Sequence, residues 1–163
     1  IGGGLLSAKF AEKTLGDVFE ENMLFYGVKL SGPGVLLPGG EMDFNILYHS
    51  GAPKPYAKYS GWQTKGMIIL LDALFIQQTS LGRNLLVYYG LGPLLHINKY
   101  EVYIKNALTD AKEFIDINDV RIGTAFAVGI GFRLKSLALK FEGKYNYDRA
   151  PYSGLGFAMQ FEL

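Results

Sequence analysis

The chain contains no cysteine, which excludes disulfide bonds and thiol chemistry and leaves its redox compartment undetermined. Neither sign of charge dominates, since 16 basic and 15 acidic residues give a net charge of +1, and this removes the electrostatic case for nucleic-acid binding. Long hydrophobic runs are also missing. The longest near-apolar stretch, Gly66 to Ile76, contains Asp72 and is far shorter than the ~20 residues of a membrane-spanning helix. We expect the 163 residues to form a single domain, 1-163.

Glycine and aromatic residues are plentiful instead, with 21 glycines and 14% aromatics, and their spacing is most informative at the carboxyl end. Large apolar residues alternate there with small or polar ones, and the large ones are Leu155, Phe157, Met159, Phe161 and Leu163. A period of two predicts a β-strand whose successive side chains point to opposite faces. The second face is mostly Gly and Ala, which suits a crowded barrel interior better than a surface exposed to water.

The segment from Val120 to Leu134 repeats this pattern at greater length. Its apolar face includes Phe126, and its other face consists of small residues with Arg121 and Arg133 near the two ends. The segment is long enough for the about nine to eleven tilted residues of a transmembrane β-strand. We therefore interpret it as one strand of a membrane barrel that is apolar on the outside and polar within.

Turn signals divide the chain into eight strands, which we place at 2–10, 22–31, 40–50, 62–78, 84–97, 120–134, 137–148 and 153–163. The polar stretch 11–21 is expected to be a loop. We interpret the stretch 98-119 as a projecting hairpin or long external loop, whereas two extra strands there would give a barrel of ten. The expected fold is therefore an all-β, antiparallel up-and-down transmembrane β-barrel of eight strands, with ten as the alternative.

The strand at 62–78 is apolar on both faces except for Asp72. We place Asp72 inside, because a carboxylate exposed to hydrocarbon costs on the order of a few kcal/mol. This orientation turns an apolar set toward the lumen, namely Ile68, Leu70, Leu74 and Ile76. The set could line a passage for apolar molecules, but we expect bulges to return some of its members to lipid. Pro93 in the next strand also suggests a bulge or a local break.

The connections fit a barrel with both termini in the periplasm. The connections near 32–39, 79–83 and 135–136 would then be periplasmic, and they are the shorter set, as membrane barrels require. Tyrosines near the outer ends of the lipid-facing stripes predict an interfacial aromatic girdle, made of Tyr26, Tyr48, Tyr145, Tyr147 and Tyr152.

With these features the chain resembles the small eight-stranded bacterial outer-membrane barrels, the OmpA-type transmembrane domain and its OmpX- and OmpW-like relatives. The resemblance is one of architecture and covers essentially the whole chain. Its most specific part is the closing strand, which resembles the signal read by the barrel-assembly machinery, although Leu163 stands where Phe is usual. The chain begins at Ile1, so we expect a mature or trimmed form in which a missing signal peptide does not argue against export.

Membership would imply a location in the bacterial outer membrane. The expected partners are outer-membrane lipid, the barrel-assembly machinery during insertion, and an envelope protein contacted through the external loops. The resemblance assigns no activity, because this fold hosts anchors, adhesins, small pores and lipid-modifying enzymes.

Charged residues of both signs are expected to point into the lumen, namely Lys9, Lys29, Glu41, Asp43, Asp72, Arg121, Arg133, Lys140, Glu142, Lys144 and Glu162. They could line an ion pore or form a network of ion pairs that plugs the barrel. We favour the plug, because eight strands leave an interior that side chains about fill and unpaired charges there are costly.

His49 and His96 are the only histidines, and both are placed on inward faces near the outer rim. A lipid hydrolase or acyltransferase could be built with Ser50 or Ser153 and a carboxylate, but no recognised motif is present. No short metal-ligand spacing occurs either, so we predict no catalytic residue, metal site or cofactor. Glycines such as Gly129 follow strand alternation and precede no helix, which argues against a nucleotide-binding loop.

Two water-soluble folds are less compatible with the sequence. A lipocalin-like barrel needs bulky apolar residues on its inner face, and the inner face of the strand at 120–134 consists of small residues instead. A β-sandwich needs a polar face exposed to water, which this strand also lacks. We expect an integral outer-membrane barrel with a mostly plugged polar lumen and a structural or surface-interaction role through its external loops. The alternatives are a narrow pore or hydrophobic passage for small or apolar solutes and, third, a lipid-modifying enzyme at the rim.

Overall fold

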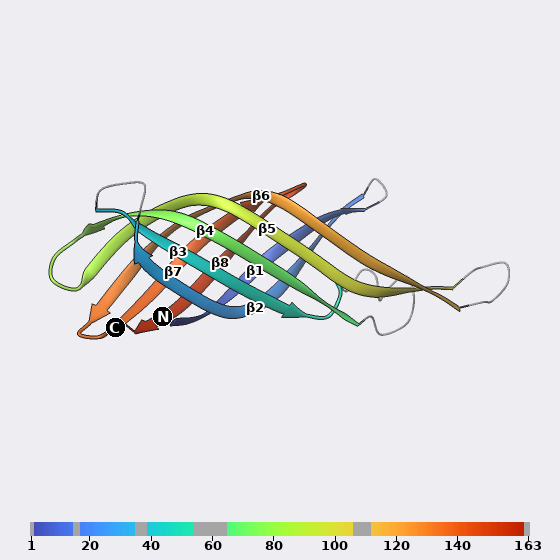
Figure 1. Ribbon diagram of the computed structural model, residues 1–163, viewed down its shortest axis with the longest axis horizontal. Helices are drawn as coiled ribbons and strands as arrows, with labels where there is room; N and C mark the ends of the chain where they lie inside the picture. Colours follow the sequence, from blue (N-terminus) through green and yellow to red (C-terminus); the bar gives the residue numbers. More distant parts are fainter. Residues whose placement is uncertain (1, 15–16, 35–38, 54–64, 106–111, 162–163) are drawn as a thin grey trace.

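The chain folds, in a computed structural model, into a closed barrel of eight antiparallel strands, each paired with its neighbours in sequence, with β8 returning to pair with β1 (Figure 1). The structure describes residues 2–14, 17–34, 39–53, 65–105 and 112–161. The strands are β1 (Gly2–Thr14), β2 (Asp17–Pro33), β3 (Glu41–Ser50), β4 (Gly66–Ser80), β5 (Leu85–Lys105), β6 (Lys112–Leu134), β7 (Leu137–Tyr147) and β8 (Pro151–Phe161). Across these described ranges, no helix is long and apolar enough to span a bilayer.

Side chains alternate across the barrel wall as the sequence predicts. On β6, Phe126 is 41% exposed on the outside while its neighbour Ala127 is 0% exposed on the inside. The outer surface carries large apolar side chains on most strands, and the inner side holds the buried residues. Closure leaves no unpaired sheet edge in the hydrocarbon region, which is the condition for a β-structure to span a membrane. The predicted all-β barrel of eight strands is confirmed.

The expectation of a loop at 11–21 is wrong. β1 and β2 form a hairpin whose pairing continues from Phe10↔Glu21 to Thr14↔Asp17. The error has a physical cause: beyond the bilayer a strand no longer needs an apolar face, so a charged stretch can pair in water without the alternation that marks a membrane strand.

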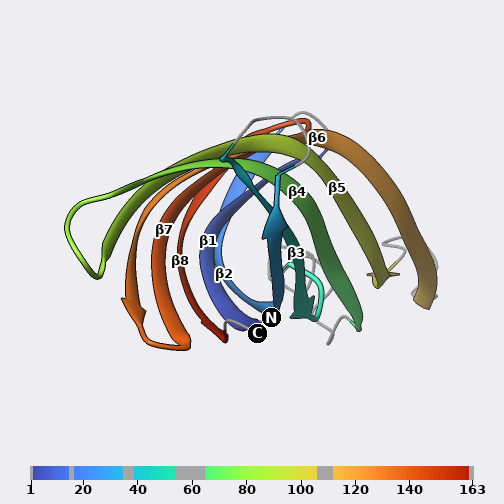
Figure 2. The same cartoon turned by 60° about the vertical axis from the view of Figure 1, so that its left-hand side comes forward.

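The stretch 98–119 forms no additional strands within the described residues. β5 and β6 pair without a change of register from Leu85↔Phe132 to Lys105↔Lys112. The result is a long hairpin that reaches away from the barrel at the end opposite the termini (Figure 1). We call this the hairpin end of the barrel, and the other the terminus end. Figure 2 shows the two termini side by side, where β1 and β8 close the barrel.

β4 carries Asp72 on the inner face together with Ile68, Leu70, Leu74 and Ile76, all buried. The expected bulge that would return some of these residues to lipid is wrong, because the pairing of β4 with β3 and β5 keeps one register along the strand. The predicted irregularity at Pro93 is a local break: the β4–β5 ladder lacks pairs only between Asp72↔Leu94 and Phe75↔Leu91. Proline has no N–H to donate, which accounts for the gap.

Candidate functional site

The middle of the barrel interior contains a buried cluster of ion pairs formed by residues of β2, β3 and β7. Lys29 of β2 donates to Glu142 of β7 at 2.7 Å and lies 3.3 Å from Asp43 of β3. Lys140 of β7 also donates to Asp43, at 3.3 Å. Asp43 therefore lies between two ammonium groups, and its other carboxylate oxygen accepts a hydrogen bond from Ser31. The contacts of β7 with β2 and β3 cross the lumen and tie its walls together.

Tyr88 of β5 completes this cluster. Its hydroxyl donates to Glu142 at 3.1 Å, and its ring centroid lies 5.4 Å from the Lys140 ammonium and 6.0 Å from that of Lys29. The ring fills space left by Gly129 on β6, where an added Cβ would lie 2.6 Å from the Tyr88 ring. The small inner face of β6 is thus matched to a large inward side chain on the adjacent strand.

A second group lies closer to the hairpin end. Asp72 of β4 accepts a hydrogen bond from Asn45 of β3 at 2.6 Å and forms an ion pair with Lys144 of β7. The side chains of Asp72 and Lys144 are almost fully buried. A buried charge is tolerated only when it is paired and hydrogen-bonded. The pair explains how an otherwise apolar strand accommodates a carboxylate.

The remaining residues of the expected lumen set are divided between the two ends. Arg121 pairs with Asp119 near the hairpin end. Glu41 and Arg133 lie half-buried at the terminus end. The side chain of Lys9 and the whole of Glu162 lie outside the described residues.

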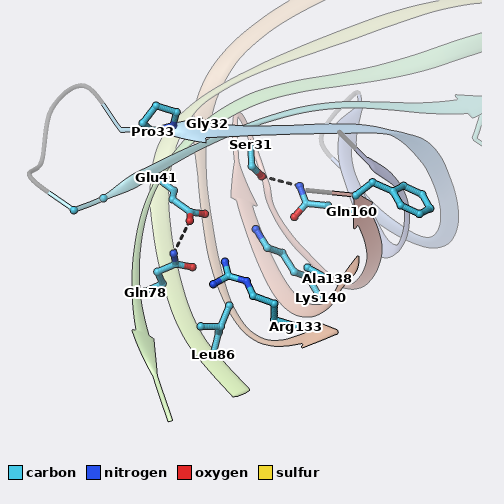
Figure 3. Close-up of a pocket in the computed structure, with 13 residues that line it drawn as sticks. Ser31, Gly32, Pro33, Glu41, Gln78, Leu86, Arg133, Ala138, Lys140 and Gln160 are labelled. Carbon is cyan, nitrogen blue, oxygen red and sulfur yellow. Dashed lines mark hydrogen bonds between the residues drawn. The ribbon is translucent and has the colours of Figure 1, made fainter. Parts of the chain in front are cut away.

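The terminus end opens into a cavity of about 560 Å³ (Figure 3). Arg133 and Lys140 line it together with Glu41 and Gln78, whose amide donates to Glu41 at 2.5 Å. Gln160 lies on the other wall and donates to Ser31 at 2.7 Å. Lys140 therefore borders the cavity while its ammonium group is engaged with the central ion pairs.

At the hairpin end, His96 is fully buried and both ring nitrogens face oxygen atoms. Nδ1 shares a hydrogen bond with Asp148, in the turn between β7 and β8, and Nε2 lies 2.8 Å from the side-chain oxygen of Asn98. Burial acts to raise the pKa of Asp148, but the hydrogen bond and charge of His96, with the Arg149 backbone N–H and Arg121, outweigh it and lower that pKa below its usual value. This arrangement holds the turn against β5.

The histidines do not form a hydrolase site with the two serines considered from sequence. Both nitrogens of His96 are occupied, and Nδ1 of His49 is bonded to the backbone oxygen of Leu24 at 2.8 Å. Ser50 and Ser153 are exposed. Among the described residues, no three His, Asp or Glu side chains gather in a way that could hold a metal ion.

The aromatic girdle expected from the sequence requires one correction. Tyr152 is 3% exposed and lies inside the barrel, with its ring in an edge contact with that of His96 at 6.2 Å between centroids. From the sequence, Tyr152 is assigned to the wrong face of its strand. Tyr152 lies an odd number of positions from the outward-facing residues of β8, so its side chain points into the barrel. Tyr26, Tyr145 and Tyr147 are exposed on the outer surface, and Tyr48 is half-exposed beside Tyr26 with ring centroids 5.3 Å apart.

The closing strand presents its large residues outward. Leu155, Phe157, Met159 and Phe161 are exposed on β8, and Phe157 packs on Phe141 of β7 with ring centroids 4.9 Å apart. Leu163 lies outside the described residues. The lumen set expected from the sequence does not include Tyr88 and Asn45, although both lie at inward-facing positions of their strands.

Comparison with known proteins supports the fold. No protein-family model matches the chain, and no curated protein sequence matches it. Among solved structures, the chain is similar to Neisserial surface protein A (NspA), with a TM-score of 0.61, 16% identity, and coverage of 99% of this chain and 95% of that one.

It is also similar to Ail, the attachment invasion locus protein of Yersinia pestis. The structure of Ail with the heparin analogue sucrose octasulfate gives a TM-score of 0.54 and 12% identity, covering 97% of this chain and 96% of that one. A second Ail structure gives a TM-score of 0.54 and 10% identity, covering 97% and 92%. At these identities the likeness shows the fold. The chain is therefore a transmembrane β-barrel with the eight-stranded architecture of the small bacterial outer-membrane proteins.

Proposed function

We propose that this protein is a non-enzymatic barrel of the bacterial outer membrane that presents its β5–β6 hairpin to molecules outside the cell. Both termini would then be periplasmic, and the hairpin end would face outward. The observation that carries the proposal is the length of the hairpin. Pairing continues to Lys105↔Lys112, whereas the partner of β6 on its other side, β7, ends at Tyr147 opposite Thr124. β4 pairs with β5 as far as Gly66↔Tyr100, so the hairpin is two-stranded beyond Tyr100↔Ile117. That part adds nothing to barrel closure and is available for contacts.

The interior supports a role other than transport. The charges of Lys29, Asp43, Lys140 and Glu142 are paired with one another across the lumen. Opening a water path would require these ion pairs to separate and their side chains to move aside in an interior that eight strands leave about filled. The pore is therefore the less favoured function. A passage for apolar molecules along the inner face of β4 is less favoured too, because Leu70, Leu74 and Ile76 are already packed in the core.

The names of the similar structures agree with a surface role. One is called a surface protein, and the other is an attachment invasion locus protein whose structure contains a heparin analogue. We extend to this chain the general role of surface contact and use heparin as a first probe. The remaining expected partners, the outer-membrane lipid and the barrel-assembly machinery, belong to the same proposal, with the exposed row on β8 as the assembly signal.

The test is a variant with a shortened hairpin. Tyr100 and Ile117 face each other across the hairpin, so replacing residues 101–116 by Asn-Gly closes the arm at a natural pair and supplies a suitable two-residue turn. Bacteria that display the full chain should adhere to heparin-coated surfaces or cultured epithelial cells. Bacteria that display equal amounts of the shortened barrel should lose that adherence. Equal adherence of the two strains to both surfaces would refute the proposal.

A further inference from the structure

The cavity at the terminus end carries opposite charges on separate strands of its wall. Among its described lining residues, Glu41 comes from β3, and Arg133 and Lys140 come from β6 and β7. In Figure 3 the charged ends of these three side chains point into one space, together with the amide of Gln78. Lys140 is also paired with Asp43 in the central cluster. Arg133 and Glu41 are therefore the charges that belong to the cavity alone.

The space between these charges is large enough for a small molecule. Its volume of about 560 Å³ lies within the roughly 300–1,000 Å³ of ligand pockets. Small residues of the barrel wall keep it open. Ala138 of β7 lines it, and on the adjacent strand an added Cβ at Gly131 would meet no atom closer than 3.6 Å. Leu86 and Phe161 add an apolar part to the lining.

The polar side chains of the wall have hydrogen-bonding capacity beyond their present contacts. Gln78 donates to one oxygen of Glu41 at 2.5 Å, and a carboxylate accepts as many as about four hydrogen bonds. The guanidinium of Arg133 has five N–H donors in a planar fork, so it can take a ligand carboxylate in addition to an existing partner. The contact from Gln78 holds the Glu41 carboxylate toward the cavity, where it can accept from a cation.

We propose that this cavity binds a small zwitterion, a free amino acid or a short peptide, with the carboxylate of the ligand on Arg133 and its ammonium group on Glu41. The two wall charges have opposite signs, and a ligand with both charges compensates both. A ligand with one charge would displace water from the other wall charge without replacing its interactions, which is unfavourable.

The proposal goes beyond the surface role of the hairpin and does not depend on it. In the orientation proposed above, the cavity opens toward the periplasm, at the opposite end from the hairpin. The apolar lining from Leu86 and Phe161 favours a ligand with small apolar side chains. Alanine and L-alanyl-L-alanine have this chemistry at two lengths, so they serve as the probes.

The experiment uses the full chain, isotope-labelled and folded in micelles of a nonionic detergent, which introduces no competing charge. At least one of the two probes should shift the NMR signals of the side-chain amides of Gln78 and Gln160 and of the Arg133 Nε–H, with saturation in the low millimolar range. The stronger of the two identifies a free amino acid or a peptide as the ligand. Its C-amidated and N-acetylated forms should each bind at least about tenfold more weakly, because each loses a hydrogen bond between charged groups.

Two variants assign each end of the ligand to its residue. Arg133→Gln should abolish the preference for the free carboxylate over the amide and keep the preference for the free ammonium group. Glu41→Gln should do the reverse. A general disturbance of the cavity would not separate the two preferences. Arg83→Gln makes the same change at an exposed arginine in the β4–β5 turn, at the same end of the barrel, and should bind as the parent does.

Three results would overturn the proposal. They are the absence of saturable shifts with either probe at tens of millimolar, equal binding of the charged and blocked forms by the parent protein, and equal weakening by Arg83→Gln and Arg133→Gln. The blocked forms test charge recognition on the parent protein itself, so the test does not require that the variants fold. Loss of adherence in the shortened hairpin is measured separately, and none of these results affects it.

Discussion

Lys144 on β7 and Asp72 on β4 form an ion pair across the barrel, between two strands that do not touch in the sheet. Asn45 supports the same carboxylate from β3. We predict that Asp72→Asn alone destabilises the barrel by about 3–5 kcal/mol, because it leaves the Lys144 ammonium buried without a counter-charge.

The double variant Asp72→Leu with Lys144→Met should recover most of that loss, since it removes both charges together. Equilibrium urea unfolding in lipid vesicles measures Asp72→Asn and the four proteins of the cycle, which are the parent, Asp72→Leu, Lys144→Met and the double variant. If the single and double variants were equally destabilised, the pair would not account for the burial of these charges.

Two glycines of β6 provide a matched pair for a packing test. An added Cβ at Gly129 would lie 2.4 Å from the backbone oxygen of Phe141 and 2.6 Å from the Tyr88 ring, whereas at Gly131 its nearest neighbour would lie at 3.6 Å. Gly129→Ala should therefore lower the midpoint of thermal unfolding in detergent or reduce folded yield. Gly131→Ala should fold as the parent does. Equal behaviour of the two variants would contradict the close fit of Tyr88 against β6.

Pro93 interrupts the ladder between β4 and β5. Odd-numbered residues of β5 point their N–H groups toward β4, as Glu101 does at 2.9 Å to Lys65, so an N–H at position 93 would face Ala73. Pro93→Ala and Pro93→Val should each gain on the order of 1 kcal/mol of stability in urea unfolding. Because both add the N–H and differ in side chain, a gain shared by the two identifies the hydrogen bond. A loss in both would show that this position needs proline.

Asp148 gives the hairpin end a dependence on pH. Its pKa is lowered in the folded protein, so the carboxylate contributes stability that is fully present above its unfolded pKa, about 4, and is lost as pH falls through the lowered folded value. The difference in unfolding free energy between the parent and Asp148→Asn should thus shrink as the pH falls below about 4 and disappear in strong acid. A difference that grew as the pH fell below about 4 would have the wrong sign for this interaction.

The alternation of lipid-facing and lumen-facing residues could be predicted from the sequence, because side chains in contact with the hydrocarbon of the bilayer must be apolar. Phe126 must face lipid if Ala127 faces the lumen, and Asp72 could only be placed inside. The same constraint is absent beyond the bilayer. The pairing of residues 11–14 with 17–20 is therefore not predicted from the sequence, and Tyr152, which directly follows the turn between β7 and β8, is assigned to the wrong face.

Which inward-facing residues form ion pairs with one another in the lumen could not be predicted from the sequence. Lys29 meets Glu142 across 113 positions of the chain. Which inward residues lie at one height depends on the tilt and stagger of the strands, and one sequence does not encode these quantities in any local pattern. The contact of Tyr88 with Glu142 depends on the same geometry.

Conductance across a planar bilayer tests most directly the claim that paired charges close the lumen. The folded protein is added alone, and an open porin is added afterwards to the same membrane to verify that insertion is detected. If the paired charges close the lumen, the membrane is silent before the porin is added, at either polarity of the applied voltage. Steady, reproducible current steps from this protein alone would contradict it.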